Sequence, residues 1–152
     1  MFKIIDGDFK KGEYSNEAYL DNWPMLYILE NGKQAYIGES THVKTRMTQH
    51  ASSEEKRIFD KVHFIYSKNF NQSVTFDYES KLIQYIVADE LFQVTNGNQG
   101  IADKQYYQKS EYDVQFEELW RKLQREKLVK HSLEEIENSD LFKISPYKEL
   151  ND

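Results

Sequence analysis

The sequence predicts an α+β fold with a small three-stranded antiparallel sheet flanked by helices. Two apolar runs, residues 25–29 and 35–37, enclose an Asn-Gly pair, which is the strongest short-range signal for a β-hairpin. A third run, residues 62–66, reads as a further strand, and two longer segments carry apolar residues at helical spacing. The length of 152 residues fits one domain.

Composition excludes several classes of protein. The 11 Tyr, 9 Phe and 2 Trp supply large side chains for a core and argue against intrinsic disorder. Because cysteine is absent, disulfides, thiolate zinc sites and cysteine nucleophiles are excluded, so a catalytic metal must bind oxygen or imidazole ligands. The sequence contains neither a membrane-length apolar run nor a signal peptide, and we expect a cytoplasmic protein without a membrane partner.

Three regions follow one another along the chain. Residues 1–23 are mixed in character and predict an irregular N-terminal extension. Residues 24–130 contain the hairpin, the third strand and the helices. From residue 131 onward six acidic residues stand against two basic ones, a local balance of -4, and this predicts an acidic tail or linker over 131–152.

Capping and apolar spacing indicate the helices. Thr41 can cap a short helix that carries Val43, Met47 and His50. A longer helix, residues 74–91, lacks glycine and proline and is expected to form the centre of the core.

A last amphipathic helix is expected from about Val114. Its apolar residues recur at helical spacing and suit ordinary core packing: Phe116, Leu119, Trp120 and Leu123.

Glu79 does not fit ordinary core packing, because it lies on the apolar side of the long helix. At 100° per residue, it falls between Leu82 and Ile83. An ionised carboxylate in that place must become protonated, pair with a cation or coordinate a metal. The alternative is that Glu79, close to the positive end of the helix dipole, reaches the rim of the core.

A second group of polar residues lies on and after the hairpin. Tyr27 and Tyr36 face out of it, Gly38 ends its second strand, and Arg46 and His50 follow at a spacing that puts them on neighbouring helical turns. Arginine suits phosphate oxygens, and a histidine can exchange protons near neutral pH. Each residue taken alone also has an ordinary structural explanation.

In their order and spacing, these residues resemble the GIY-YIG nuclease family. The resemblance spans about residues 24–98. It rests on Met25-Leu26-Tyr27, Tyr36-Ile37-Gly38, Arg46, His50 and Glu79. It implies that the two tripeptides form adjacent strands of a three-stranded antiparallel sheet, that the arginine and the glutamate are catalytic, and that the glutamate holds a divalent metal.

The sequence departs from the family pattern at several positions. Met25 and Leu26 replace the first Gly and Ile. Glu39 stands where some relatives carry a lysine, which makes the site less positive. The asparagine that closes the family motif is expected to be Asn96 rather than Asn98.

The activity that the resemblance implies is that of a metal-dependent DNA endonuclease, which hydrolyses phosphodiester bonds in DNA repair, recombination or defence. Mg²⁺ or Mn²⁺ would bind Glu79, and either Tyr27 or His50 would be the general base. The residues implied to be catalytic are Tyr27, Tyr36, Arg46, His50 and Glu79, and those that support the site are Gly38 and Asn96.

Charge limits how strongly the chain attracts DNA, because the formal net charge is -6. Residues 38–68 are locally positive, with six basic and four acidic residues. We expect Lys44, Lys56 and Arg57 to bind nucleic acid there. The resemblance further implies an attached ATPase or helicase-like domain C-terminal to this chain. The sequence leaves homo-oligomer formation open.

Two other functions are compatible with the sequence. The domain could be a catalytically silent module that binds nucleic acid or a partner, in which case binding would need no metal. Alternatively, the helix stripe from Phe116 to Leu123 could be an exposed interaction surface.

Overall fold

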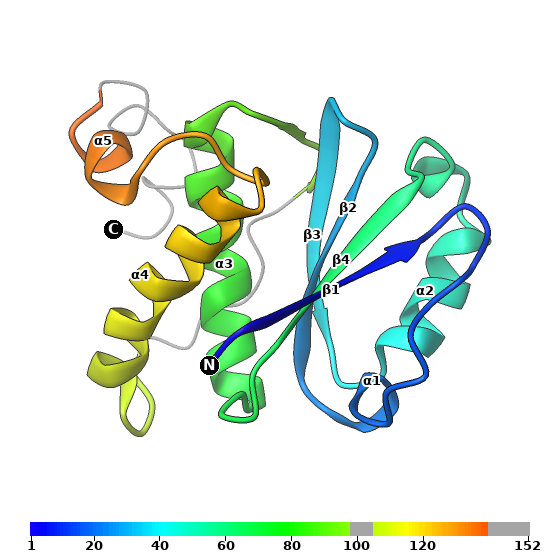
Figure 1. Ribbon diagram of the computed structural model, residues 1–152, viewed down its shortest axis with the longest axis horizontal. Helices are drawn as coiled ribbons and strands as arrows, with labels where there is room; N and C mark the ends of the chain where they lie inside the picture. Colours follow the sequence, from blue (N-terminus) through cyan, green and yellow to red (C-terminus); the bar gives the residue numbers. More distant parts are fainter. Residues whose placement is uncertain (98–104, 140–152) are drawn as a thin grey trace.

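A computed structural model describes residues 1–97 and 105–139 of the chain (Figure 1). One mixed sheet has the strand order β1-β4-β2-β3-β5. Its strands are β1 (Lys3–Asp8), β2 (Met25–Glu30), β3 (Gln34–Ser40), β4 (Lys61–Tyr66) and β5 (Gln93–Val94). The helices are α1 (Tyr19–Asn22), α2 (Val43–Ala51), α3 (Gln72–Asp89), α4 (Lys109–Arg125) and α5 (Leu133–Glu137), with a 3₁₀ turn at Glu54–Lys56.

The predicted α+β class is confirmed, and the three predicted strands form the antiparallel centre of the sheet. β2 lies between β3 and β4, and both neighbours pair with it antiparallel. The prediction of only three strands is wrong, because β1 joins β4 antiparallel and the short β5 joins β3 in parallel. The sheet is therefore mixed rather than purely antiparallel.

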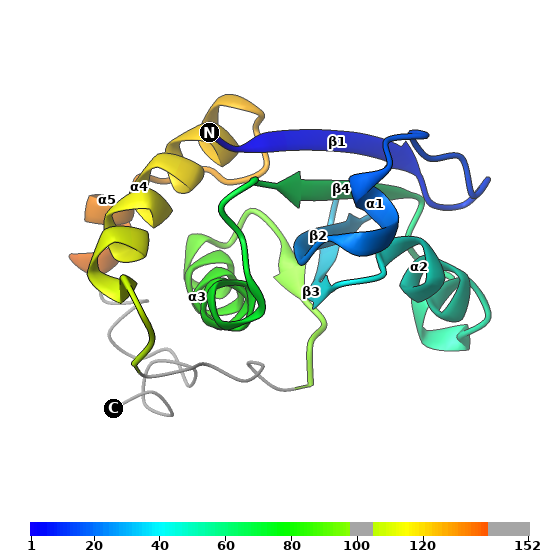
Figure 2. The ribbon, with the colours of Figure 1, turned by 90° about the horizontal axis from the view of Figure 1, so that it is seen from below.

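The N-terminal segment differs most from the sequence prediction. We expected residues 1–23 to be irregular, but β1 pairs with the whole length of β4 (Figure 2). Ile4 packs against the core on one face of the sheet and Ile5 against the core on the other. Asp6 and Gly7 are poor strand formers, so tertiary pairing rather than local preference makes this segment a strand.

The hairpin between β2 and β3 forms where predicted, but with a different turn. Glu30 pairs with Ala35, which leaves a loop of four residues. Gly32 alone in that loop has a positive φ, at 86°, so the turn is not the expected type I′. The Asn31 side chain instead accepts hydrogen bonds from the backbone of Lys33 and Gln34, at 3.0 and 2.7 Å.

Helix α2 is also present, although Thr41 does not cap it. The N-cap residue is His42, whose backbone N–H donates to the Ser40 hydroxyl at 2.9 Å. Val43 and Met47 are buried against the sheet, as their spacing predicts. This packing fixes the direction of the remaining residues on the helix.

The two long helices agree with the apolar pattern. α3 covers nearly the whole predicted span, and the Asn71 side chain caps it by accepting from Val74 N–H at 3.0 Å. α4 begins five residues before Val114, and its predicted stripe is buried. That burial makes the stripe part of the core and removes the basis for an exposed docking surface.

Helix α5 lies within the predicted acidic tail. A capping box between Ser132 and Glu135 begins it, and Ile136 is buried in the core that α3 and α4 share. Residues 140–152, which complete the predicted tail, lie outside the described part of the chain.

Alternating side chains build a separate core on each face of the sheet. Leu26, Ile28 and Ile65 face α3 and α4. Tyr27 and Phe64 face α2 on the other side. In Figure 1, α3, α4 and α5 lie on one side of the sheet, and α1 and α2 lie on the other. Within residues 1–97 and 105–139, no helix combines the length and the apolar character needed to cross a membrane.

His63 links three neighbouring strands through charged hydrogen bonds. Its Nδ1 lies 2.7 Å from Oδ1 of Asp6 on β1, and its Nε2 lies 2.8 Å from Oε2 of Glu30 on β2. Burial alone would lower the pKa of His63, but the bonds to Glu30 and Asp6 outweigh burial and raise it. Hydrogen bonding from His63 lowers the pKa of Glu30.

We predict that His63→Gln destabilises the protein by about 2 kcal/mol in mildly acidic solution, since it removes a hydrogen bond between charged groups. The raised pKa of His63 adds stability below about pH 6.5, which is lost as the pH rises through the folded-state pKa. The lowered pKa of Glu30 adds stability above about pH 4.5, which is lost in more acidic solution. Urea unfolding from pH 4 to 9 tests this, and a pH-independent difference would contradict it.

Candidate active site

The first feature of the site is the close crossing of Tyr27 over Gly38. The two residues are directly paired on β2 and β3, and the Tyr27 side chain is completely buried. A Cβ atom on Gly38 would lie only 2.3 Å from both Cζ and Oη of Tyr27. Glycine is therefore required at this position so that the phenol ring can lie across β3.

This crossing brings the Tyr27 hydroxyl to helix α2. Its Oη lies 2.8 Å from Nε2 of His50. The ring of Tyr36 lies edge-on to the His50 imidazole, with centroids 5.4 Å apart. Three residues that the sequence assigned to one site, from β2, β3 and α2, are thus in direct contact.

Arg46 lies one helical turn before His50 and is half-buried. Its guanidinium lies near the Tyr27 hydroxyl and opposes the rise that burial causes in the pKa of that group. Within the described part of the chain Arg46 forms no ion pair with a carboxylate. Its positive charge therefore remains available for an anionic ligand.

The site holds His50 and Tyr27 in their neutral forms. Burial, followed by the charges of Lys56 and Arg46, lowers the pKa of His50 to about 4. Burial also raises the pKa of Tyr27, and Arg46 offsets only part of that effect. In the neutral tautomer that carries its proton on Nδ1, the imidazole accepts at Nε2 the hydrogen bond that the phenol donates.

The three cations that were expected to bind nucleic acid occupy different places. Lys56 lies in the site, because its Nζ is 4.0 Å from the ring centroid of Tyr36 and its side chain is only 12% exposed. Lys44 lies farther out, 3.9 Å from the carboxylate of Asp21. Arg57 is exposed on the segment that follows the 3₁₀ turn.

Glu79 approaches the same region from α3, on the other face of the sheet. Its side chain is half-buried and lies close enough to the Glu39 backbone for that group to favour the ionised carboxylate. Burial, reinforced by the negative charge of Glu39, raises the pKa of Glu79 to about 7, while Arg46 opposes the rise. The carboxylate thus lies at the boundary between core and surface. This position is intermediate between the two that the sequence left open, the apolar side of the helix and the rim of the core.

Glu39 belongs to this group, although the sequence did not assign it a role. Its Oε2 lies 3.2 Å from the hydroxyl of Thr75, which is buried one helical turn before Glu79. Burial raises the pKa of Glu39. The spacing of Thr75 and Glu79 by four residues on α3 is the sequence signal, but it has meaning only once the helix is known to face β3.

Asn96 supports the edge of β3 next to this group. Its Oδ1 accepts from Ile37 N–H at 3.0 Å, and its Nδ2 donates to the Ile37 carbonyl at 2.7 Å. These two bonds replace the backbone hydrogen bonds that a further residue of β5 would make with β3. Asn98, the alternative candidate, lies outside the described residues.

The donor set of the site suits a hard divalent cation. Carboxylate oxygens are the ligands that Mg²⁺ and Mn²⁺ prefer, and Mg²⁺ commonly takes one or two of them together with water and substrate phosphate. Among residues 1–97 and 105–139, no three or more acidic, histidine or cysteine side chains gather into a metal site. A cation here would therefore complete its coordination with ligands from solvent or substrate.

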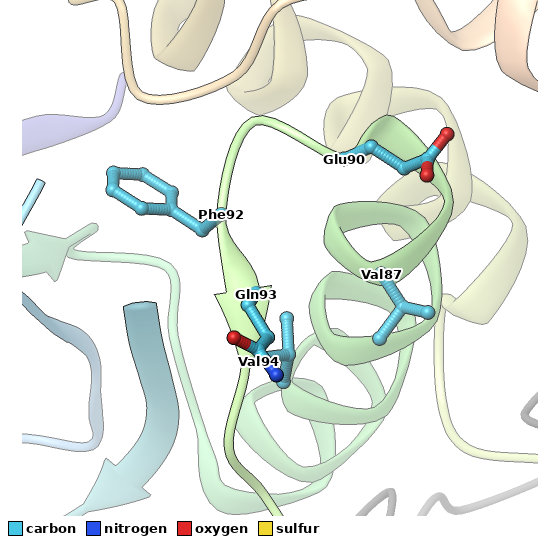
Figure 3. A pocket seen from close by; sticks show the side chains of 5 residues that line it. All are labelled: Val87, Glu90, Phe92, Gln93 and Val94. Atoms are coloured by element: carbon cyan, nitrogen blue, oxygen red, sulfur yellow. The ribbon is translucent and has the colours of Figure 1, made fainter. Parts of the chain in front are cut away.

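A separate cavity of about 370 Å³ lies between the end of α3 and β5 (Figure 3). Tyr27, Tyr36, His50 and Glu79 are not among the residues that line it. Its lining is Val87, Glu90, Phe92, Gln93 and Val94.

Comparison with known protein families identifies the type of domain. The model of the GIY-YIG catalytic domain matches residues 24–86. This range includes Tyr27 and Tyr36 of the two tripeptides, together with Arg46, His50 and Glu79. No curated protein and no solved structure matches the chain.

We predict that Gly38→Ala destabilises the protein by about 1–3 kcal/mol, because the added methyl group must displace the Tyr27 ring. Gly97→Ala is the matched control, since a Cβ there meets nothing within 4 Å. Thermal unfolding measures both. Equal melting temperatures for the two variants would contradict the close crossing.

Proposed function

Residues 24–86 form a GIY-YIG catalytic domain, a domain of a nuclease family, and from this premise we propose that the chain is a DNA endonuclease that depends on Mg²⁺ or Mn²⁺. The observation that supports it most is the contact of Tyr27 with His50, next to a guanidinium that forms no ion pair with the described carboxylates. Together these groups place a proton acceptor beside a positively charged side chain.

Tyr27 and His50 act as one proton-accepting unit. The attacking water gives its proton to Oη of Tyr27 while the phenol proton passes to Nε2 of His50, 2.8 Å away. His50 is thus the final acceptor, and Tyr27 orients the water and transfers the proton without becoming a free phenolate. We therefore propose His50 as the general base, a role that the sequence left open between the two residues.

The negative charge of the substrate favours this transfer. Lys56 and Arg46 lower the pKa of His50 in the free protein. A bound phosphate offsets both positive charges, and the affinity of His50 for a proton then increases. The base is therefore strengthened by the substrate on which it acts.

Arg46 and Lys56 stabilise the charge that develops on the phosphorus-bound oxygens. Arginine can contact two of these oxygens at once. Glu79 would hold the divalent cation, and when bound this ion polarises the phosphate and stabilises the leaving oxygen. Tyr36 fixes the positions of the His50 ring and the Lys56 ammonium, which it contacts on its edge and its face.

The charge of the chain favours an attached domain that supplies DNA affinity. Phosphate neutralisation provides much of the affinity for DNA, and the chain has a formal net charge of -6. An ATPase or helicase-like domain C-terminal to this one would meet that need, in DNA repair, recombination or defence. The other candidate function is a catalytically silent binding module, which the complete set of catalytic residue types disfavours.

We predict that the chain nicks or cleaves DNA with Mg²⁺ or Mn²⁺ and not with EDTA, and that Glu79→Gln reduces the rate to background. The control is Glu126→Gln, which changes an exposed carboxylate beyond the end of α4. Labelled single-stranded, duplex and branched DNA are the substrates. DNA binding without cleavage in any lane, unchanged in Glu79→Gln, would instead support the silent module.

We further predict that Tyr27→Phe and His50→Ala each slow cleavage about 10²–10⁴-fold, the range for general acid-base catalysis. The double variant should be slowed no more than the slower single variant, because the two residues transfer one proton. Single-turnover rates at saturating DNA measure this. Fully additive losses would show that the residues act separately.

A further inference from the structure

A tight turn joins the site to strand β4. The Phe59 backbone N–H donates to the Lys56 carbonyl at 3.2 Å, which closes the turn. The side chains at its two ends are held inward, because Lys56 lies over the Tyr36 ring in the site and Phe59 is buried in the core beside α2. The two corner residues, Arg57 and Ile58, are exposed. The turn therefore presents one cationic and one apolar side chain to solvent next to the site.

Hydrogen bonds from three other parts of the chain fix the position of this turn. In the hairpin loop, Nδ2 of Asn31 donates to the Ile58 carbonyl at 3.1 Å. The Asp60 N–H donates to the Glu30 carbonyl of β2 at 3.2 Å. After β1, the Phe9 N–H donates to the Asp60 carbonyl at 3.0 Å. Because these contacts hold it on several sides, the turn presents Ile58 in a defined position.

The location of Ile58 distinguishes it from the other exposed apolar residues. Ile58 is 46% exposed, although the next residue is buried. Among the described residues, the other large apolar side chains that are exposed are Met1, Tyr107 and Val114, at the N-terminus and on or just before α4. Ile58 instead follows Lys56 by two residues. Since consecutive Cα atoms are about 3.8 Å apart, the Cα atoms of these two residues are at most about 7.6 Å apart.

The chemistry of the turn fits duplex DNA. Its four residues carry two positive charges and no negative one, which complements a phosphate backbone. Proteins that kink DNA insert apolar side chains, isoleucine among them, between base steps and unstack the bases. Successive base pairs are about 3.4 Å apart along the helix axis. With the scissile phosphate on Lys56, the Ile58 side chain therefore reaches the neighbouring base step.

We propose that Ile58 is a wedge that inserts between two stacked bases beside the cleaved phosphodiester, while Arg57 binds an adjoining phosphate. The inference rests on the proposed function, which supplies the position of the DNA. Unstacking costs least where a base step is already weakened, as in mismatched DNA. Ile58 thus sets a preference for such DNA, whereas Arg57 contributes affinity without preference.

Binding of a mismatched duplex tests the wedge directly. Two short duplexes of the same sequence are compared, one fully paired and one with a central mismatch. Each carries 2-aminopurine, a base whose fluorescence increases when it is unstacked, beside the central position. Titrations with the full chain at low salt concentration contain EDTA, which prevents metal-dependent cleavage. We expect binding about tenfold tighter to the mismatched duplex, with a several-fold rise in its fluorescence.

Variants of the two corner residues separate preference from affinity. Ile58→Ala should bind both duplexes equally and lose the rise in fluorescence, because alanine is too short to enter the base stack. Ile58→Leu should retain both properties. Arg57→Gln should weaken binding of both duplexes by the same factor and keep the preference. The matched control is Val114→Ala, which shortens an exposed apolar side chain on α4 and should behave as the wild type does.

Several results would overturn the wedge. One is a mismatch preference and a fluorescence rise in Ile58→Ala equal to those of the wild type. Another is a wild type that binds neither duplex, or that binds them without a change in fluorescence. Unaltered DNA binding in Ile58→Ala, together with loss of self-association measured by sedimentation, would instead place Ile58 in an interface between two copies of the chain.

Cleavage of the same duplexes with Mg²⁺ or Mn²⁺ tells this inference apart from the proposed function. Equal cleavage of both duplexes by the wild type and by Ile58→Ala would refute the wedge and leave the nuclease function standing. A mismatch preference that is lost in Ile58→Ala, without cleavage of any DNA in either metal, would support the wedge and refute the nuclease function.

Discussion

The arrangement of the site depends on the missing side chain at Gly38. Because no Cβ stands between the strands, the fully buried Tyr27 ring crosses β3 and its hydroxyl reaches α2. Only in that place does it meet His50 at 2.8 Å and the guanidinium of Arg46. The packing of Val43 and Met47 on the sheet sets the direction in which α2 presents those two residues. Gly38 thus allows the Tyr27 ring to pack in the core on this face while its hydroxyl reaches the polar residues His50 and Arg46.

The outer edge of β3 explains how residues from both faces of the sheet meet. Alternate residues of this edge find different partners: Ala35 pairs with β5, Ile37 with the Asn96 side chain, and the Glu39 side chain with Thr75 of α3. β5 is only two residues long, so no strand of the described residues pairs with this edge beyond Ala35. Arg46 on one face of the sheet and Glu79 on the other therefore both act on this end of β3.

The hairpin, the third strand and the two long helices could be predicted because their apolar periods are local properties of the sequence. The edge strand β1 could not, since Asp6 and Gly7 disfavour a strand and only pairing with β4 makes one. The order of the residues predicted that Tyr27, Tyr36 and His50 would lie together, and they are in contact. The contact of Glu39 with Thr75 could not be predicted in this way. It exists only because α3 packs across β3, a long-range arrangement that no local pattern records.

The central claim is that Tyr27 donates its proton to a neutral His50. A pH titration of His50 by nitrogen-15 imidazole NMR, on the free protein and on Tyr27→Phe, tests it most directly. We expect a pKa of about 4 in the free protein and an Nε2 resonance at pH 7 that reports a hydrogen-bond acceptor and changes in Tyr27→Phe. A pKa near the ordinary value of about 6.5, or an Nε2 that carries the proton at pH 7, would contradict the account.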